Sequence, residues 1–348
     1  AVRPSAIFER GDYRKPGKAV TPSVPAGLHS PIDGPPNRLT LARWLVDRNN
    51  PLVARVTVNR WWAELFGRGL VGTPEDFGIK GELPTHPELL DWLSVEFMEH
   101  NWSMKHVLRT IVLSSAYQQS SSTTSEQLEH DDLNVHLARG PRFRMDAEMI
   151  RDNALAVSGL LNLQQGGPPI RPPQPEGLWA KVGGVQYDYE VSPPGQRHRR
   201  GIYVVIKRSA PNPTLNTFDA PGRLTCSAKR ARTNTPLQAL SLLNDPVFVE
   251  CAQAMAARVL SSSSVHTVEE RLSLAMTLAV ARTPSQQELA TLASLLNDQR
   301  AKFQLRPQDA QSIAKQGGWN ESSSASDYAA WVSVCRVLLN LHETITRP

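Results

Sequence analysis

The sequence has no long apolar run and no block of charges of one sign. No stretch approaches the roughly 18 consecutive apolar residues that a membrane-spanning helix needs, so we expect no membrane span. Its 38 lysines and arginines are interspersed with 33 aspartates and glutamates, which gives a net charge of only +5. This mild, scattered basic charge argues against nucleic acid as a partner.

Cysteine is scarce, with only three in 348 residues: Cys226, Cys251 and Cys335. None of them belongs to a CxxC or CxxCH motif or to a Cys/His ligand spacing, which excludes a zinc ribbon and a covalently attached c-type haem. We therefore expect no cofactor and no metal in this chain. One disulfide would be compatible with the sequence, and for Cys226 we favour burial or a disulfide over a reactive thiol.

The signatures of several enzyme classes are missing as well. The chain has no GxSxG, no HExxH, no phosphate-binding P-loop and no GxGxxG after a strand. Whether the protein is an enzyme is thus left open. The chain begins at Ala1 without a recognisable signal peptide, and we expect it to be a piece of a longer precursor.

Helical periodicity dominates what is present, and a hydrophobic fraction of 40% suffices for a real core. We predict a mainly α fold with two helical units, joined by an irregular Pro/Gly-rich segment that holds a small β-hairpin or sheet. The predicted parts are an extended lead-in or linker at 1–36, an N-terminal helical unit at 37–162, the irregular segment at 163–234 and a C-terminal helical unit at 235–348. A single integrated domain over 37–348 is the alternative.

Apolar spacing and capping residues predict the individual helices. Thr85 with Glu88, Thr267 with Glu270, and Ser285 with Glu288 have the spacing of capping boxes. The only convincing strand is 202–206, with a partner expected around 182–189, and the Ser/Thr-rich 118–134 is expected to be a solvated loop. Helices are predicted at 37–50, 51–66, 85–100, 104–117, 147–161, 236–244, 246–260, 268–281, 286–303 and 326–342.

The most informative stretch is 230–246, with the sequence RARTNTPLQALSLLNDP. Thr235 followed by Pro236 predicts a helix start, with threonine as the N-cap. The polar loop in front of it contributes arginines and an amide. A helix N-terminus with such neighbours is either a tightly hydrogen-bonded junction or an anion-binding site. We place it at the seam between the irregular segment and the C-terminal helical unit.

Asp219 lies close before this loop and is a candidate base or orienting carboxylate. Arginines around it would contact an anionic or polyhydroxylated ligand. The alternative is that these arginines tie irregular backbone together through its carbonyl groups. The candidate ligand-binding residues of this region are Arg199, Arg208, Arg232, Asn234, Gln238 and Trp179.

A second group of carboxylates lies on the helix predicted at 147–161. Asp146, Glu148 and Asp152 would share a proton or bind a hard cation, and Glu148 is a further candidate for acid/base catalysis. Arg144 and Arg151 are close in the sequence, so a network of structural salt bridges is the alternative.

Histidine and aromatic residues supply the remaining candidates. His86, in the first turn of a predicted helix, is a candidate base or ligand. Trp179, Tyr187 and Tyr189 alternate with glycine and proline, as suits carbohydrate binding or a clamp over the helical core. The pair at 61–62, Trp-Trp, either packs in a core or stacks on a sugar or haem edge.

Several sequence blocks, in order over roughly 37–345, resemble those of one known family. They are NRLTLARWLVD at 37–47, NRWW at 59–62, FGRGLV at 66–71, PTHPELLDWL at 84–93, RTNTPLQAL at 232–240 and VLLNLHE at 337–343. Together they resemble the planctomycete-specific DUF1553 (PSD1) family.

This resemblance implies a setting rather than an activity. Members of the family usually follow a DUF1549 domain, and often a cytochrome c-like domain, behind a signal peptide. The resemblance therefore implies an exported protein of the periplasm or cell envelope, whose partners are the upstream domains of its own precursor. No activity is established for the family that the resemblance could transfer.

Three functions follow from these observations. The first is a binding or assembly module of a larger exported, cytochrome-associated protein. The second is an enzyme or binding protein acting on polysaccharide or sulfated glycan through an Arg/Asp-lined pocket, which a carboxylate pair about 5 to 9 Å apart would favour. The third is support of electron transfer, with the redox centre supplied by another domain.

Overall fold

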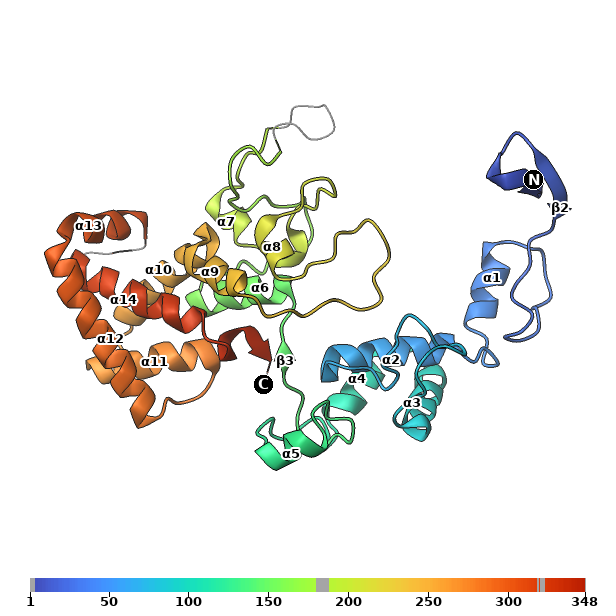
Figure 1. Cartoon of the computed structure of the whole chain (residues 1–348), viewed down its shortest axis with the longest axis horizontal. Helices are drawn as coiled ribbons and strands as arrows, with labels where there is room; N and C mark the ends of the chain where they lie inside the picture. The colour runs from blue at the N-terminus through green and yellow to red at the C-terminus, as the bar shows by residue number, and fades with distance from the viewer. Residues whose placement is uncertain (1–3, 180–187, 318, 320–322, 348) are drawn as a thin grey trace. The chain divides into compact units, whose positions relative to one another are not determined.

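The computed structural model describes residues 4–179, 188–317, 319 and 323–347. Within them, fourteen α-helices and two small two-stranded sheets confirm the predicted mainly α fold (Figure 1). No helix of these ranges is long and apolar enough to cross a membrane. The chain divides into two compact units, 1–141 and 142–348.

The described residues of the first unit form a hairpin, five α-helices and one 3₁₀ helix. The hairpin pairs β1 with β2 in antiparallel register, Ser5 opposite Val20, within the region that we expected to be an extended lead-in. Its elements are β1 (Ser5–Phe8), the 3₁₀ helix η1 (Glu9–Gly11), β2 (Pro16–Val20), α1 (Arg38–Leu45), α2 (Val53–Phe66), α3 (Pro87–Glu99), α4 (Met104–Val112) and α5 (Ser125–His130).

The core of the first unit lies between α2, α3 and α4. Trp62 stacks on Phe66 with ring centroids 4.1 Å apart, and Trp61 meets Phe97 edge to face at 4.9 Å. Asn59 is fully buried, and its amide group pairs with both the N–H and the C=O of Val71. The Trp-Trp pair therefore packs in a core, which is the first of the two interpretations given above.

The second unit is larger and contains nine helices among the residues described. We expected the first helical unit to extend to residue 162, but α6 packs against α10 of the second unit. The elements are β3 (Phe143–Arg144), α6 (Ala147–Ser158), α7 (Pro194–Arg197), the 3₁₀ helix η2 (Gly201–Tyr203), α8 (Pro213–Thr217), α9 (Pro236–Asn244), α10 (Pro246–Leu260), α11 (Val268–Val280), α12 (Gln286–Leu305), α13 (Pro307–Gln316), α14 (Ala325–Leu339), the 3₁₀ helix η3 (Glu343–Ile345) and β4 (Thr346–Arg347).

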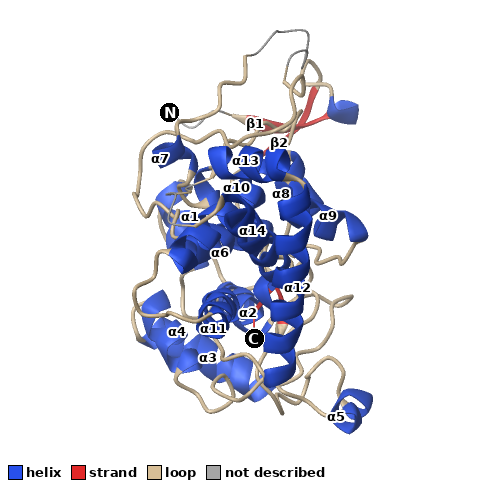
Figure 2. Cartoon of the chain, turned by 90° about the vertical axis from the view of Figure 1, so that its left-hand side faces the viewer, coloured by secondary structure: helices blue, strands red, loops and turns tan. Residues whose placement is uncertain are grey.

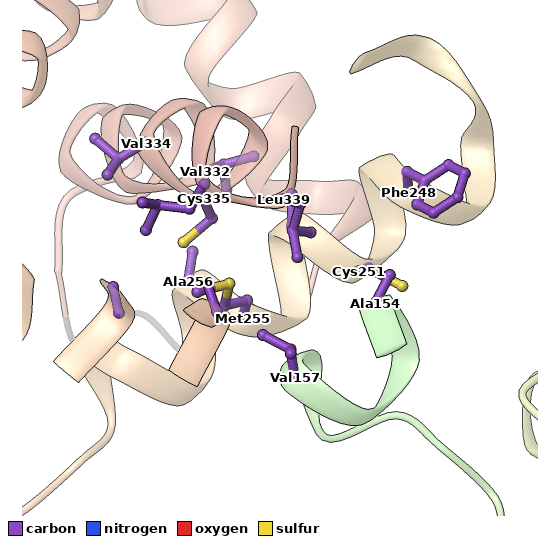
Figure 3. Close-up of a cluster of buried hydrophobic side chains, with 14 of the residues drawn as sticks. Ala154, Val157, Phe248, Cys251, Met255, Ala256, Val332, Val334, Cys335 and Leu339 are labelled. Carbon is purple, nitrogen blue, oxygen red and sulfur yellow. The ribbon is translucent and has the colours of Figure 1, made fainter. Parts of the chain in front are cut away.

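Helix α14 is the centre of this unit and lies between α10 and α12 (Figure 2). Ten of its fifteen residues are buried, which explains why its sequence is apolar nearly all round. Side chains of α6, α10 and α14 point toward one another in the core, among them Val157, Met255 and Cys335 (Figure 3). Strand β4 pairs with β3, which ties the C-terminal segment to the residues just before α6.

Two of the three predicted capping boxes are confirmed and one is wrong. Thr267 with Glu270 begins α11 and Ser285 with Glu288 begins α12, each with both reciprocal hydrogen bonds. At α3 the N-cap is His86, and the backbone N–H and hydroxyl of Thr85 both donate to the carbonyl oxygen of Leu70. The threonine is thus used to attach a loop instead of capping the helix.

The strand predicted at 202–206 is wrong. This stretch begins with the 3₁₀ helix η2, and Val204 then makes only an isolated bridge with Ile170. Pro168 and Pro169 precede Ile170, and Pro172 and Pro173 follow Arg171, so this segment has few N–H groups to extend the bridge into a ladder. Most of the partner expected at 182–189 lies outside the described residues.

The stretch 118–134 is not entirely a loop, because it contains the short helix α5. Thr124 and Gln127 form a capping box at its start, with the Thr124 N–H donating to Gln127 Oε1 at 3.1 Å. None of the six residues of α5 is buried, so the segment is exposed to solvent as we expected. Part of its backbone is helical, however, where we expected a loop.

Candidate functional site

The stretch around the start of α9 is the centre of a polar cluster in the second unit. Thr235 is the N-cap of α9 and Pro236 its first residue, which confirms the predicted helix start. The Thr235 N–H donates to Gln238 Oε1 at 3.3 Å. We use the name arginine junction for this cluster, which comprises Arg144, Asp146, Glu148, Asp219, Arg223, Arg230, Arg232, Thr233, Asn234 and Gln238.

Gln238 is the hub of the arginine junction and is only 1% exposed. Its Nε2 donates to the carbonyl oxygen of Thr217 at 3.0 Å and to Thr233 Oγ1 at 3.1 Å. Its Oε1 accepts a hydrogen bond from Arg144, which also donates to Asn234 Oδ1 at 2.9 Å. The amide oxygens of both predicted ligand-binding residues are therefore occupied by an arginine of the same chain.

Asp219 fastens the loop in front of α9. Its carboxylate accepts from the Thr233 N–H at 2.7 Å and from the Thr233 hydroxyl at 2.8 Å. The backbone of Asp219 is left-handed, with φ at +62°, a conformation that is costly for residues other than glycine. Asp219 also offsets part of the fall in the pKa of Arg144, which burial lowers. Asp219 acts here as an orienting carboxylate for this loop.

Glu148 and Asp146, at the start of α6, are both held by arginines. Arg230 reaches Glu148 at 2.6 Å and Asp146 at 3.3 Å. Arg223 lies 3.9 Å from Glu148, and Arg232 lies 3.9 Å from Asp146. The N-terminal end of a helix favours negative charge, so the start of α6 is a favourable place for both side chains.

Cations also gather around the aromatic ring of Phe143 in β3. The guanidinium carbon of Arg232 lies 4.4 Å from the centroid of this ring, and that of Arg347 lies 5.8 Å away. Burial, followed by the positive charges of Arg144 and Arg142, lowers the pKa of His342. The electrostatic field at this side of the junction is thus positive.

The space inside the arginine junction is small. A cavity of about 10 Å³ lies between Arg144, Asp219 and Arg230, which is room for about one water molecule. A larger cavity of about 340 Å³ lies between the C-terminal helices, where Leu243, Phe303 and Arg336 contribute to its walls. None of the site residues predicted from the sequence lines that larger cavity.

A separate, buried set of hydrogen bonds joins α6 to the irregular segment around Arg199. Arg199 is 1% exposed, donates to the carbonyl oxygens of Pro168 and Gly166, and lies 3.9 Å from the centroid of the Tyr203 ring. Arg151 donates to the carbonyl oxygen of Arg199 at 2.7 Å. Asp152 accepts from the Gly201 N–H at 2.5 Å, and burial raises the pKa of Asp152. These contacts correspond to the alternatives in which arginines and salt bridges hold the irregular segment to α6.

The predicted aromatic platform is packed inward. Trp179 is 8% exposed and meets Tyr189 edge to face at 4.9 Å, with Lys207 Nζ 4.7 Å from the centroid of its ring. The Tyr189 hydroxyl donates to the carbonyl oxygen of Pro172 at 2.5 Å, and burial raises its pKa to about 12. Tyr187 lies outside the described residues. The arrangement is that of a clamp.

Three other candidates lie apart from the arginine junction. Arg208 is exposed and is not one of the residues of the arginine junction. His86, in the first unit, is half-buried, with its Nδ1 3.0 Å from Thr85 Oγ1. Cys226 is exposed and free, so the expectation of burial or a disulfide was wrong. Cys251 and Cys335 are buried and free, and burial raises the pKa of each to about 12.

Two features were missed in the sequence. Arg144 was considered only as a neighbour of the carboxylates, because no local pattern predicts a bond to Gln238 across 94 positions. Glu96, His100 and His106 come together in the first unit. The four-residue spacing of Glu96 and His100 on one helix was a signal for this second cluster.

The described residues define a class of protein: mainly α, with two helical units and a polar junction closed by arginine–carboxylate pairs. The chain belongs to the PSD1 family, described as proteins of unknown function (DUF1553), whose model matches residues 37–296. The resemblance is thereby confirmed over the part from the start of α1 into α12. No curated protein and no solved structure matches the chain.

Proposed function

We propose that this chain is a binding and assembly module of a larger exported, cytochrome-associated protein. Its partners are the DUF1549 and cytochrome c-like domains that precede such a domain in the same precursor. Family membership supports this setting, and the arginine junction is the surface by which the module docks.

The proposal rests on the fact that all three carboxylates in the junction are bound by groups of the same chain. Glu148 and Asp146 are paired with Arg230, and Asp219 binds the Thr233 N–H and hydroxyl. Catalysis by general acid or base requires a carboxyl group within reach of a substrate proton. Asp146 and Asp219 line a cavity of only about 10 Å³, which has no room for a sugar ring. The geometry therefore favours docking over turnover of a glycan.

The same residues supply a surplus of positive charge at the edge of the junction. Four arginines, at 144, 223, 230 and 232, stand against three carboxylates, at 146, 148 and 219. The side chain of Arg223 is 48% exposed and lies 3.9 Å from Glu148. Exposed guanidinium groups of this kind bind carboxylates on a partner and accelerate encounter with it. The partner surface is accordingly acidic.

The glycan alternative has less support, because its aromatic platform is not accessible. Trp179, at 8% exposure, is covered by Tyr189 and Lys207. Stacking on a sugar requires an open ring face, and the edge of Trp179 alone offers little contact area.

The test is the affinity of the chain for the separately expressed upstream domains, measured by titration calorimetry. Arg223→Glu places a negative charge at the exposed edge, and we expect the affinity to fall about tenfold or more because like charges oppose each other across the interface. Arg306→Glu is the matched control, since Arg306 is an exposed arginine outside the junction. Absence of affinity in the unaltered chain, or equal affinity of the two variants, contradicts the proposal.

A further inference from the structure

Two histidines and one glutamate of the first unit meet where α3 ends and α4 begins. Glu96 Oε1 lies 2.7 Å from His106 Nε2 and 3.3 Å from His100 Nδ1. The two imidazole rings are stacked, with their centroids 3.7 Å apart and their planes 11° from parallel. One ligand atom from each of the three residues lies within 4.8 Å of the others.

A sharp reversal of the backbone produces this cluster. Asn101 and Trp102 both have left-handed backbones, with φ at +55° and +57°, and they turn the chain so that His106 returns to Glu96. Two such residues in succession are strained and persist only where their surroundings fix them. The Trp102 ring packs edge to face on Phe97 at 5.0 Å, and the backbone N–H of Trp102 donates to the Phe97 carbonyl oxygen at 2.9 Å.

The cluster is open on one side. The side chains of Glu96, His106 and His100 are 21%, 32% and 46% exposed. The carboxylate is thus partly enclosed, while water has access to the rings. The C-terminal carbonyl groups of α3 carry partial negative charge, which favours a cation at this place.

We propose that Glu96, His100 and His106 bind one divalent transition-metal ion, for which Zn²⁺ is the best match. Two imidazole nitrogens and one carboxylate oxygen are a ligand set that zinc prefers, with water in the fourth position. Bond lengths of about 2.0 to 2.1 Å place the ligand atoms of a tetrahedral site roughly 3.4 Å apart. The two separations from Glu96, 2.7 and 3.3 Å, need only small adjustments, and rotation of the exposed His100 ring would bring it out of its stack on His106 to face the same ion.

The ion would link the last turn of α3 to the first turn of α4. The Nδ1 of His100 also lies 3.0 Å from the Glu96 carbonyl oxygen. A ring nitrogen that binds the ion carries no proton, so this contact is given up when Nδ1 becomes a ligand. The site belongs to the first unit alone and does not depend on the docking function proposed above.

The test is a calorimetric titration of the chelator-treated full chain with Zn²⁺, at pH about 7.5 because binding requires unprotonated imidazoles. We expect one ion per chain at this site and an affinity that falls about tenfold or more in Glu96→Gln and in His106→Ala. His130→Ala is the matched control, since His130 is an exposed histidine at the end of α5, and it should leave the affinity unchanged.

The absorption spectrum of the Co²⁺-loaded chain is the second measurement, because its visible bands report coordination geometry. Tetrahedral bands that disappear in His100→Ala support the site, and this variant changes the most exposed ligand, so folding is least affected. The proposal is overturned if the unaltered chain binds no Zn²⁺, if the ligand variants bind it as the control does, or if Mg²⁺ is preferred over Zn²⁺.

Discussion

Gln238 shows how a single polar side chain holds irregular segments together. It is almost wholly buried, and its amide joins the end of α8, the loop before α9 and Arg144 of β3. A buried polar group is favourable only when its hydrogen-bonding capacity is used. Gln238 meets this condition through the nearby Thr233 hydroxyl and through two groups farther away along the chain, the Thr217 carbonyl and Arg144.

Replacing Gln238 with leucine is expected to lower the free energy of unfolding by about 2 to 3 kcal/mol. Leucine has a similar volume, but it leaves Arg144 and the Thr217 carbonyl without their partner. The measurement is urea unfolding of the full chain, followed by circular dichroism. Gln304→Ala, at an exposed position of α12, serves as the control and should change stability by less than about 0.5 kcal/mol. If Gln238→Leu lowered the free energy of unfolding as little as the control does, the hydrogen bonds of Gln238 would not contribute to stability.

Prediction from sequence succeeded for residues whose role is local. Thr235 and Pro236 begin a helix because capping depends on a few adjacent positions. The partner of Gln238 is 94 positions away, and only the folded chain brings it near. Asp219 was recognised as a notable carboxylate, but its bond to Thr233 depends on a left-handed backbone that no side-chain pattern predicts.

At the scale of elements, one arginine secures the corner between α11 and α12. Arg282 donates to both carboxylate oxygens of Glu288 and to both of Glu343, at 2.7 to 3.0 Å. Glu288 also completes the capping box of α12 by accepting from the Ser285 N–H at 2.7 Å. The hydrogen bonds of Arg282, and then those of Ser285, lower the pKa of Glu288 to about 2.

Because the pKa of Glu288 is low, we expect the stability difference between the unaltered chain and Glu288→Gln to depend on pH. The carboxylate of Glu288 is stabilised by folding, so its contribution is complete above the usual pKa of 4.5 and is lost as the pH falls through about 2. Glu288→Gln should therefore be less stable than the unaltered chain at pH 7, by less than about 1 kcal/mol because the pair is exposed.

The measurement is the free energy of unfolding of both proteins from pH 7 down to pH 2. We expect the difference between them to remain constant above pH 4.5 and to shrink below it. Gln287→Ala, at the neighbouring position, carries no titrating group and should give a difference that does not vary with pH. A Glu288→Gln difference that is just as constant would mean that the ion pair contributes nothing.

The longer helices with large apolar residues were predicted, whereas α5, α7, α8 and α13 were not. Helix α14 was found because its apolar residues recur at helical intervals, whereas α13 buries only Ala310 and Ala314, which are too small to give a clear apolar signal. The stretch 202–206 has the composition of a strand, but the neighbouring segment 168–173 is rich in proline and cannot form a continuous strand beside it. In that segment, tertiary contacts determine the backbone more than local preference does.

At the scale of the whole molecule, the chain has two units with separate polar features. The first unit contains the cluster of Glu96, His100 and His106, and the second contains the arginine junction. The sequence predicted a mainly α fold with more than one helical unit, because apolar residues recur at helical spacing along most of the chain. It did not predict that Glu96, His100 and His106 come together, because their proximity depends on the turn between α3 and α4 rather than on a contiguous motif.

The central claim is that the arginine junction docks onto the upstream domains of the same precursor. Hydrogen–deuterium exchange of the full chain, with and without those domains, tests it most directly, because docking slows exchange of the backbone amides that it covers. The account predicts slower exchange across residues 219–234, which connect Asp219 to Asn234. Unchanged exchange in this segment, under conditions in which the upstream domains are bound, would contradict it.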